Sequence, residues 1–205
     1  MSATAVKVDT REAILDAMDS LMGRFGYRKT NMDDLAREAG ISKRTIYLHF
    51  SSKEEVGLSS IGRVVETAQV RMRDIATEGR DPRDTIKKML VERVMARVRA
   101  VGEYRQSLDE LFEAVRPAYL VRRQEQFQAE QAILATALRE GRSSGAFHFD
   151  SAQATARDLL FATNAYLPYS LSVRELGDIE EIEIRVQRLA ALLVRGLCQP
   201  REEIR

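Results

Sequence analysis

The stretch that decides the fold of this chain runs from Thr30 to Phe50 and reads TNMDDLAREAGISKRTIYLHF. Residues 31–39 and 42–50 both carry apolar side chains at helical spacing. Gly40 lies between them and can adopt the positive φ that a tight turn needs. Two short helices joined by such a turn are typical of a helix-turn-helix. The second helix would then turn outward a polar and aromatic face made of Lys43, Arg44, Thr45, Tyr47, Leu48 and His49.

Capping residues support both helices. Thr30, with Asp33 three residues later, predicts the start of the first helix, and Ser42 predicts the start of the second. The free N–H groups at the start of the second helix can also face a phosphate. From spacing alone, two short helices of an ordinary helical bundle remain an equal alternative.

The rest of the chain also shows helical periodicity, and no segment shows strand alternation bounded by hairpin turns. We therefore expect an all-α protein of about nine helices, with a small N-terminal unit and a larger remainder. Outside the opening stretch, the predicted helices cover residues 9–25, 52–75, 82–101, 104–114, 117–140, 150–172 and 178–198. Pro168 should kink or end the helix that contains it. The charged run Arg122–Gln131 is interpreted as a solvated helix face.

Composition excludes several classes of protein. The 205 residues include 1 cysteine and 2 histidines, which excludes an internal disulfide and leaves little for a metal site. No phosphate-binding loop, dinucleotide turn, zinc-protease motif or serine-hydrolase motif occurs, so we expect neither an enzyme nor a cofactor. The longest uncharged run, Leu159–Val173, is too short to span a membrane. With no signal-peptide pattern at the start, we expect a cytoplasmic protein.

The run Phe25–Val56, FGYRKTNMDDLAREAGISKRTIYLHFSSKEEV, resembles the N-terminal pattern of the TetR/AcrR family of bacterial regulators. The resemblance implies a three-helix helix-turn-helix DNA-binding domain over residues 1–55. It implies a larger helical ligand-binding and dimerisation domain over residues 56–205. The expected function is a transcriptional repressor that a small-molecule inducer releases from a palindromic operator. The alternative is a helical protein-interaction or ligand-binding module whose helix-turn-helix is degenerate.

The resemblance also assigns roles to single residues. Thr30 and Lys53 resemble phosphate contacts, and Tyr47 and His49 resemble contacts to the DNA backbone. Two positions depart from the common pattern: Arg44 replaces a frequent glycine, and Leu48 replaces a polar or aromatic residue. Arg44 can reach a guanine edge, whereas Leu48 can meet a thymine methyl or simply pack. The full expected DNA-binding set is Thr30, Ser42, Lys43, Arg44, Thr45, Tyr47, Leu48, His49 and Lys53.

Local charge agrees with DNA binding although the global charge does not. The whole chain has 32 basic and 31 acidic residues, a formal net charge of +1. From Arg24 to Lys53, seven basic residues face three acidic ones, a local net charge of +4. The acidic surplus of the N-terminal part lies mainly on the first helix, which need not touch DNA. A local patch of this kind predicts binding that weakens steeply with salt.

The last two predicted helices carry broad apolar faces. One monomer can bury them, but in the resembling family they form a dimer interface with the partner's copies. A twofold dimer would place two recognition helices about 34 Å apart on a palindrome. We therefore expect a homodimer.

The resemblance further implies a small-molecule effector in the larger part. Aromatic and methionine side chains at helical spacing are commonly core, and together they can also line an apolar pocket. The candidate pocket residues are Met89, Tyr104, Phe112, Arg116, Tyr119, Phe161 and Asn164. The identity of the effector and the operator sequence are not predicted. The helix that begins near Ser52 links the two parts and would transmit the effector's action.

Overall fold

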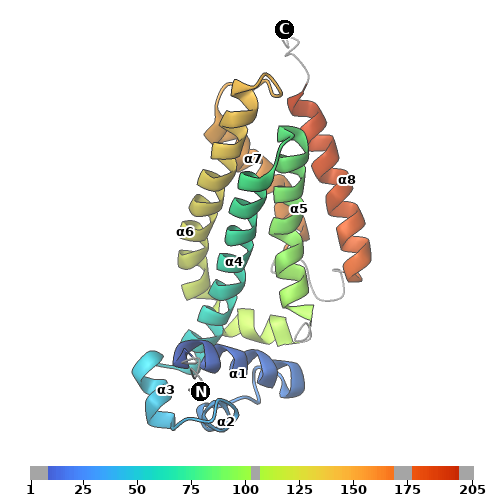
Figure 1. Ribbon diagram of the computed structural model, residues 1–205. Coiled ribbons are helices and arrows are strands. Elements are labelled where there is room, and N and C mark those ends of the chain that lie inside the picture. Colours follow the sequence, from blue (N-terminus) through green and yellow to red (C-terminus); the bar gives the residue numbers. More distant parts are fainter. Residues whose placement is uncertain (1–8, 103–106, 169–176, 199–205) are drawn as a thin grey trace, which may run out of the picture. The chain divides into compact units, whose positions relative to one another are not determined.

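A computed structural model describes residues 9–102, 107–168 and 177–198. Within these residues the fold is all-helical, as predicted, with eight α-helices and a short 3-10 helix (Figure 1). The elements are α1 (Thr10–Phe25), α2 (Met32–Glu38), α3 (Lys43–His49), α4 (Lys53–Glu78), α5 (Pro82–Ala100), α6 (Leu108–Ser143), α7 (Ala152–Thr163), η2 (Asn164–Tyr166) and α8 (Ile179–Leu197). No helix among the described residues combines the length and apolarity needed to cross a bilayer.

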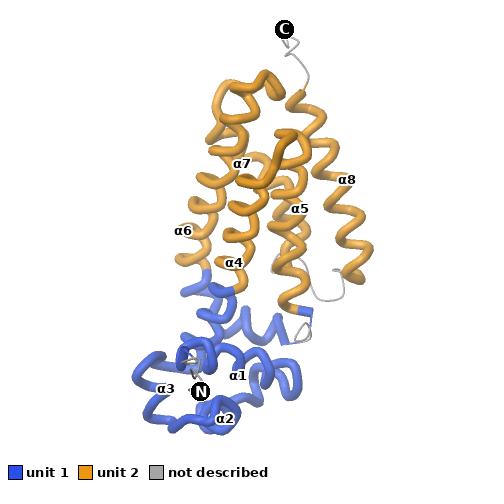
Figure 2. The backbone as a smooth tube through the Cα atoms, viewed as in Figure 1, with its two compact units in different colours: residues 1–63, 102–119 blue, residues 64–101, 120–205 orange. Residues whose placement is uncertain are grey.

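The chain forms two compact units, which Figure 2 colours separately. The first consists of residues 1–63 and 102–119, and the second of residues 64–101 and 120–205. The helices α4 and α6 each begin in the first unit and continue into the second. The predicted functional boundary between residues 55 and 56 falls inside α4 and stays a prediction.

The first unit is built around the apolar face of α1. Asp9 caps this helix by accepting a hydrogen bond from the Arg11 N–H at 2.9 Å. Gly26 follows the helix with a φ of +88°, which a residue with a side chain rarely adopts. The buried side chains of this unit recur every three or four residues along α1 and continue into α2 and α3. They include Ile14, Leu15, Met18, Leu21, Met22, Leu35, Ile46 and Phe50.

The second unit packs its helices around a larger apolar core. Asp81 caps α5, and Pro82 occupies its first turn, where a missing N–H costs nothing. The predicted inward residues Ile86, Met89 and Leu90 are buried, together with Leu134 and Leu138 of α6. α8 runs beside α5 and contributes the buried side chains Ile182, Val186, Ala190 and Val194.

Two helix boundaries differ from the sequence prediction. A break between residues 114 and 117 was predicted, but α6 continues through Pro117 from Leu108 to Ser143. Proline removes one hydrogen bond from a helix, and buried side chains on both sides, such as Leu111, Val115 and Tyr119, hold the helix despite that loss. The helix predicted over residues 150–172 ends earlier, at Thr163, and residues 169–172 lie outside the described part of the chain.

Pro168 explains the early end of α7. The residue before a proline is driven out of the helical conformation by a steric clash. Leu167 is accordingly extended, with φ of −76° and ψ of 141°. The single turn of η2 leads from the α-helix to this extended residue, with the Leu167 N–H bonded to the Asn164 carbonyl at 3.1 Å.

Candidate nucleic-acid interface

The turn between α2 and α3 has the geometry of a helix-turn-helix. Gly40 adopts a φ of +67°, and the Ile41 N–H donates to the Ala36 carbonyl at 3.0 Å. Leu35 of α2 and Ile46 of α3 are fully buried, so the two helices are fixed by the same core. The outward face of α3 is therefore held in place by packing on its opposite side.

The cap of α2 differs from the prediction. Asn31, and not Thr30, is the N-cap residue, with an extended backbone at φ of −132° and ψ of 175°. Its side-chain oxygen accepts from the N–H groups of Asp33 and Asp34 at 2.9 and 3.0 Å. The Asp34 carboxylate accepts in turn from the Asn31 N–H at 3.2 Å, which completes a capping box. Threonine is the weaker cap residue, and here the asparagine beside it takes the position.

Ser42 caps α3 as predicted. Its hydroxyl oxygen accepts from the Thr45 N–H at 3.0 Å and lies 2.8 Å from the Thr45 hydroxyl. Lys43, the first helical residue, forms an ion pair with Asp33 of α2 at 2.9 Å. That hydrogen bond raises the pKa of Lys43 and ties the starts of the two helices together.

The exposed face of α3 carries the side chains that could read a base sequence. Leu48 is 76% exposed and Tyr47 is 50% exposed, and Arg44 and His49 are also exposed. Leu48 was expected either to meet a thymine methyl or to pack within the protein, and its exposure shows that the second expectation is wrong for the described residues. Arg44 and Leu48 are four residues apart and so lie on the same side of the helix. Arg44 has no acidic partner among the described residues.

Thr30 and Lys53 lie inside the corner that joins α1 to α2. Thr30 is buried, and its hydroxyl donates to the Gly26 carbonyl at 2.9 Å. The Lys53 ammonium donates to the carbonyls of Tyr27 and Thr30 at 3.1 and 3.0 Å and lies 4.2 Å from the centre of the Tyr27 ring. Burial is the main cause that raises the pKa of Tyr27 to about 12. Both predicted phosphate contacts thus have bonds within the protein, and their role on DNA stays a prediction.

Ion pairs reduce the free positive charge of this region. The three acidic residues between Arg24 and Lys53 are each paired with a basic one: Asp33 with Lys43, Asp34 with Arg37, and Glu38 with Arg24. Another basic residue, Arg28, bonds to Glu113 at 2.6 Å. Within the described ranges, Lys29, Arg44 and Lys53 remain as basic side chains without an ion pair, and the Lys53 ammonium is already bonded to two backbone carbonyls, which leaves Lys29 and Arg44. They are the available cations for DNA phosphates and bases.

The acidic surplus on α1 also has a partner within the first unit. The Arg63 guanidinium of α4 lies 3.0, 2.6 and 2.7 Å from the carboxylates of Glu12, Asp16 and Asp19. Burial, partly offset by hydrogen bonds from Ser60 and Arg63, raises the pKa of Asp19. This cluster joins α4 to α1, so these carboxylates of α1 stabilise the packing of the first unit.

The beginning of α6 belongs to the same unit, which the sequence did not indicate. The Ser107 hydroxyl donates to the Met22 carbonyl at 2.9 Å. The backbone N–H of Arg28 donates to the Glu110 carboxylate at 3.0 Å, one helical turn before Glu113. These contacts join residues more than 80 positions apart in the chain, and sequence periodicity carries no signal for such pairs.

The structure distributes the predicted effector-pocket residues over both units. Phe112, Arg116 and Tyr119 lie in the first unit, where the Phe112 and Tyr119 rings meet edge to face at 5.1 Å. In the second unit Met89 is core, Phe161 is 57% exposed beside Phe127, and Asn164 accepts from Arg93. Tyr104 lies outside the described residues. These positions stay predictions for the effector site.

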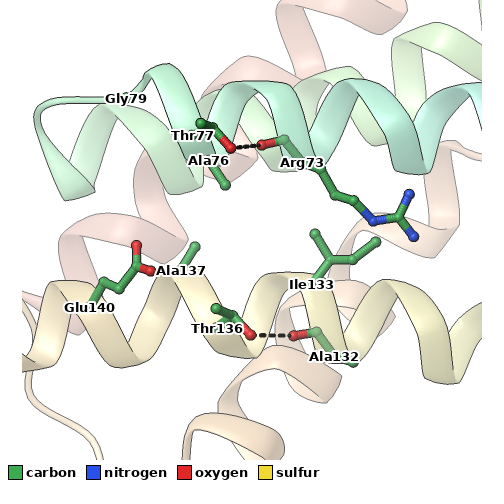
Figure 3. Close-up of a pocket in the computed structure, with 9 residues that line it drawn as sticks. All are labelled: Arg73, Ala76, Thr77, Gly79, Ala132, Ile133, Thr136, Ala137 and Glu140. Carbon is green, nitrogen blue, oxygen red and sulfur yellow. Dashed lines mark hydrogen bonds between the residues drawn. The ribbon is translucent and has the colours of Figure 1, made fainter.

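A groove of about 760 Å³ lies elsewhere in the second unit, between α4 and α6 (Figure 3). Most of the residues that line it are alanine, threonine or glycine, with Arg73 toward one end and Glu140 toward the other. The hydroxyls of Thr77 and Thr136 donate to carbonyls of their own helices at 3.0 and 3.1 Å. None of the predicted effector-pocket residues lines this groove. Its lining is Arg73, Ala76, Thr77, Gly79, Ala132, Ile133, Thr136, Ala137 and Glu140.

Comparison with known proteins supports the assignment of the helix-turn-helix. A family model described as bacterial regulatory proteins, tetR family, matches residues 14–57. The transcriptional regulator EthR of Mycobacterium tuberculosis H37Rv is 40% identical over 78 residues, which are 38% of this chain and 35% of EthR. The regulator YerO of Bacillus subtilis is 31% identical over 84 residues, 40% of this chain and 29% of YerO. The match thus spans about a third of the length of these relatives.

Solved structures match over nearly the whole chain. A transcriptional regulator from Cytophaga hutchinsonii has a TM-score of 0.75 at 20% identity, covering 92% of this chain and 98% of that one. A TetR transcription regulator from Haloarcula marismortui has a TM-score of 0.74 at 19% identity, covering 93% and 99%. At this identity the likeness concerns the fold. Residues 14–57 thus form a helix-turn-helix of the tetR family type, and the chain shares its overall fold with solved TetR regulators.

Proposed function

We propose that the chain is a DNA-binding transcriptional repressor, and that a small-molecule effector releases it from a palindromic operator. The observation that carries this proposal is the exposed face of α3. Arg44, Tyr47, Leu48 and His49 are all exposed, while the opposite side of the helix is anchored through Ile46. A short helix fixed in this way can enter the major groove without rearranging its own core. A protein acting on chromosomal DNA would be cytoplasmic.

Two neighbouring side chains on α3 would read the base sequence. Arg44 lies in the first turn, where recognition helices contact base edges. Its guanidinium can donate two hydrogen bonds to a guanine, and Leu48, one turn later, can contact a thymine methyl. Lys43 is held by Asp33 and would instead support the orientation of the helix.

A homodimer would bring two copies of α3 to one operator. The chain itself buries Leu159, Leu160 and Leu167, so most of the apolar face predicted for the penultimate helix is internal. What remains exposed is a smaller set on α7 and α8, including Phe161 and Leu192, the latter 62% exposed. A partner copy that covered these side chains would remove their apolar surface from water, which would stabilise the dimer. Leu192→Glu should therefore shift the chain from dimer to monomer in light scattering, whereas Arg83→Glu, at an exposed position of α5, should not.

The continuous helices α4 and α6 offer the connection between effector and DNA. Each passes from the first unit into the second without a break. An effector that binds one conformation of the second unit more tightly would shift the protein toward that conformation and so change the position of α3. The size of the shift would be set by the difference between the effector's affinities for the two conformations. The sequence pointed to the first of these helices, and the contacts of Ser107 and Arg28 add α6.

The test is a footprint of the full chain on the intergenic DNA beside its own gene. Arg44→Ala should weaken binding to the protected palindrome about 10–100-fold, because a bidentate guanine contact discriminates by about 1–3 kcal/mol. Tyr47→Ala should also weaken it. Arg83→Ala removes an exposed arginine from α5 and serves as the control.

The same experiment tests the alternative. If no palindrome is protected at low salt, or if Arg44→Ala and Tyr47→Ala change the protection no more than Arg83→Ala does, the assignment to DNA binding fails. The chain would then be a helical interaction or ligand-binding module with a degenerate helix-turn-helix.

A further inference from the structure

The second unit contains a buried cluster of charged side chains. Arg93 and Arg97 of α5 and Glu130 of α6 are each at most 5% exposed. The Arg93 Nε lies 2.7 Å from one Glu130 oxygen, and Arg97 bonds to the other oxygen. Charged side chains are almost never fully buried unless they are paired, and buried clusters of perturbed charge concentrate at functional sites.

Arg93 is almost fully satisfied by acceptors within the protein. Besides Glu130, its guanidinium donates to the Leu160 carbonyl, the Thr163 hydroxyl and the Asn164 side-chain oxygen, at 3.3, 2.9 and 2.8 Å. These acceptors come from the end of α7 and from η2. Arg93 therefore uses four of its five N–H groups and has the contacts of a structural side chain.

Arg97 has fewer acceptors. One of its N–H groups donates to the Arg93 carbonyl at 2.5 Å and another to Glu130. A guanidinium has five N–H groups, so three of them have no acceptor among the described residues. Buried donors in proteins are nearly always bonded. Each terminal nitrogen of Arg97 has one acceptor and keeps a second N–H group, which an additional acceptor could take.

The cluster also carries surplus positive charge. Burial alone would raise the pKa of Glu130, but the charges and hydrogen bonds of Arg93 and Arg97 outweigh burial and lower it. Glu130 is therefore ionised near neutral pH and balances one of two permanent cations. A buried charge without a counter-charge is costly, and an anion placed beside Arg97 would remove that cost.

Apolar side chains surround this charge. Val94 and Val98 of α5, on either side of Arg97, belong to a buried cluster with Leu167 and Ile182. On the α6 side, Phe127 lies one turn before Glu130, and its ring centre is 4.9 Å from that of Phe161. A ligand that uses the Arg97 donors would place its remaining atoms among hydrocarbon groups.

We propose that Arg97 is the anchor of an effector site for a monoanion, a carboxylate on an apolar body, and that the Arg93–Glu130 pair positions Arg97. The proposal rests on the proposed effector-regulated function and names the chemical class of its effector. In this arrangement Asn164, one of the predicted polar pocket residues, helps to hold Arg93 in place. One carboxylate supplies the missing charge and acceptors for two of the unmet N–H groups.

The test compares octanoate with octanamide on the full chain in the absence of DNA, by calorimetry and by the thermal unfolding midpoint. The two probes share the same chain and differ in charge. We expect octanoate to bind at least tenfold more tightly than octanamide, because a hydrogen bond to a charged group strengthens binding by about a factor of ten or more. Arg97→Gln should abolish this preference. Arg99→Gln, which alters an exposed arginine two residues along α5, should keep it.

Equal binding of the two probes, binding of neither, or a preference that survives in Arg97→Gln would overturn the proposal. The comparison of probes on the unaltered chain stands even if a variant does not fold. Arg97→Gln leaves Arg93 and Glu130 as a balanced pair, so it should fold. A separate titration on operator DNA tests the proposed function: octanoate binding that depends on Arg97 without any DNA binding by the chain would refute only that function.

Discussion

Glu130→Gln should destabilise the second unit far more than its small change in shape suggests. Each Glu130 oxygen bonds to one buried arginine. A glutamine can offer one carbonyl oxygen, and its amide N–H groups would face the other guanidinium, donor against donor. Removing one partner of a buried ion pair costs about 3–5 kcal/mol, since the remaining charge stays buried. For a chain of this length that corresponds to a fall of about 6–20 °C in unfolding midpoint.

The measurement is urea and thermal unfolding followed by circular dichroism. Glu125→Gln makes the same chemical change on the exposed face of α6 and should stay within about 0.5 kcal/mol of the unaltered chain. If the two variants unfold alike, the buried ion pairs do not stabilise the unit and the reasoning is wrong.

Acid should erase the difference between the unaltered chain and Glu130→Gln. The arginines lower the pKa of Glu130 in the folded state below its ordinary value of 4.5. A group with a depressed folded pKa stabilises the fold fully above its unfolded pKa and loses that effect as pH falls through the folded value. The gap in stability should thus be constant near neutral pH and shrink progressively below pH 4.5. A gap that stays unchanged at acid pH would mean that the charge of Glu130 is not its cause.

Three further changes follow from particular contacts. Asn31→Ala removes the cap of α2 and should lower stability by about 1 kcal/mol in urea unfolding, whereas Thr30→Ser, which keeps the hydroxyl, should have a smaller effect. Arg63→Met removes three ion pairs to α1, and we expect a loss of about 1–3 kcal/mol that is smaller in high salt; a salt-independent loss would point to packing instead. Pro117→Ala restores a helical hydrogen bond to the Glu113 carbonyl and should raise the unfolding midpoint, so a fall would show that α6 needs the proline there.

Local patterns explain why much of the fold could be predicted. Gly40, Ser42 and the apolar spacing around Leu35 and Ile46 act over a few residues, and each appears in the structure at its predicted position. Helix caps at Asp9 and Asp81 follow the same logic. Errors arose where neighbours compete, as Asn31 does with Thr30, or where long-range packing supports a helix through Pro117.

Charge placement was the main failure. The run Arg122–Gln131 was interpreted as a solvated face, but Glu130 is buried because Arg93 and Arg97 of another helix meet it there. The sequence carried little indication of this burial, because spacing along a helix does not distinguish a buried charged residue from a solvated one. A pair of arginines at i and i+4 among buried positions of α5 would have been the available clue.

The amino-acid sequence by itself determined that the chain is helical, where most helices begin and end, and that residues 30–50 form a helix-turn-helix, because these depend on backbone preferences and spacing within a few turns. Only the tertiary structure decided which charges are free and which are paired, that the start of α6 joins the unit of α3, and that two arginines share one buried carboxylate. Those features depend on residues far apart in the chain, whose energies of burial and pairing arise only once helices pack.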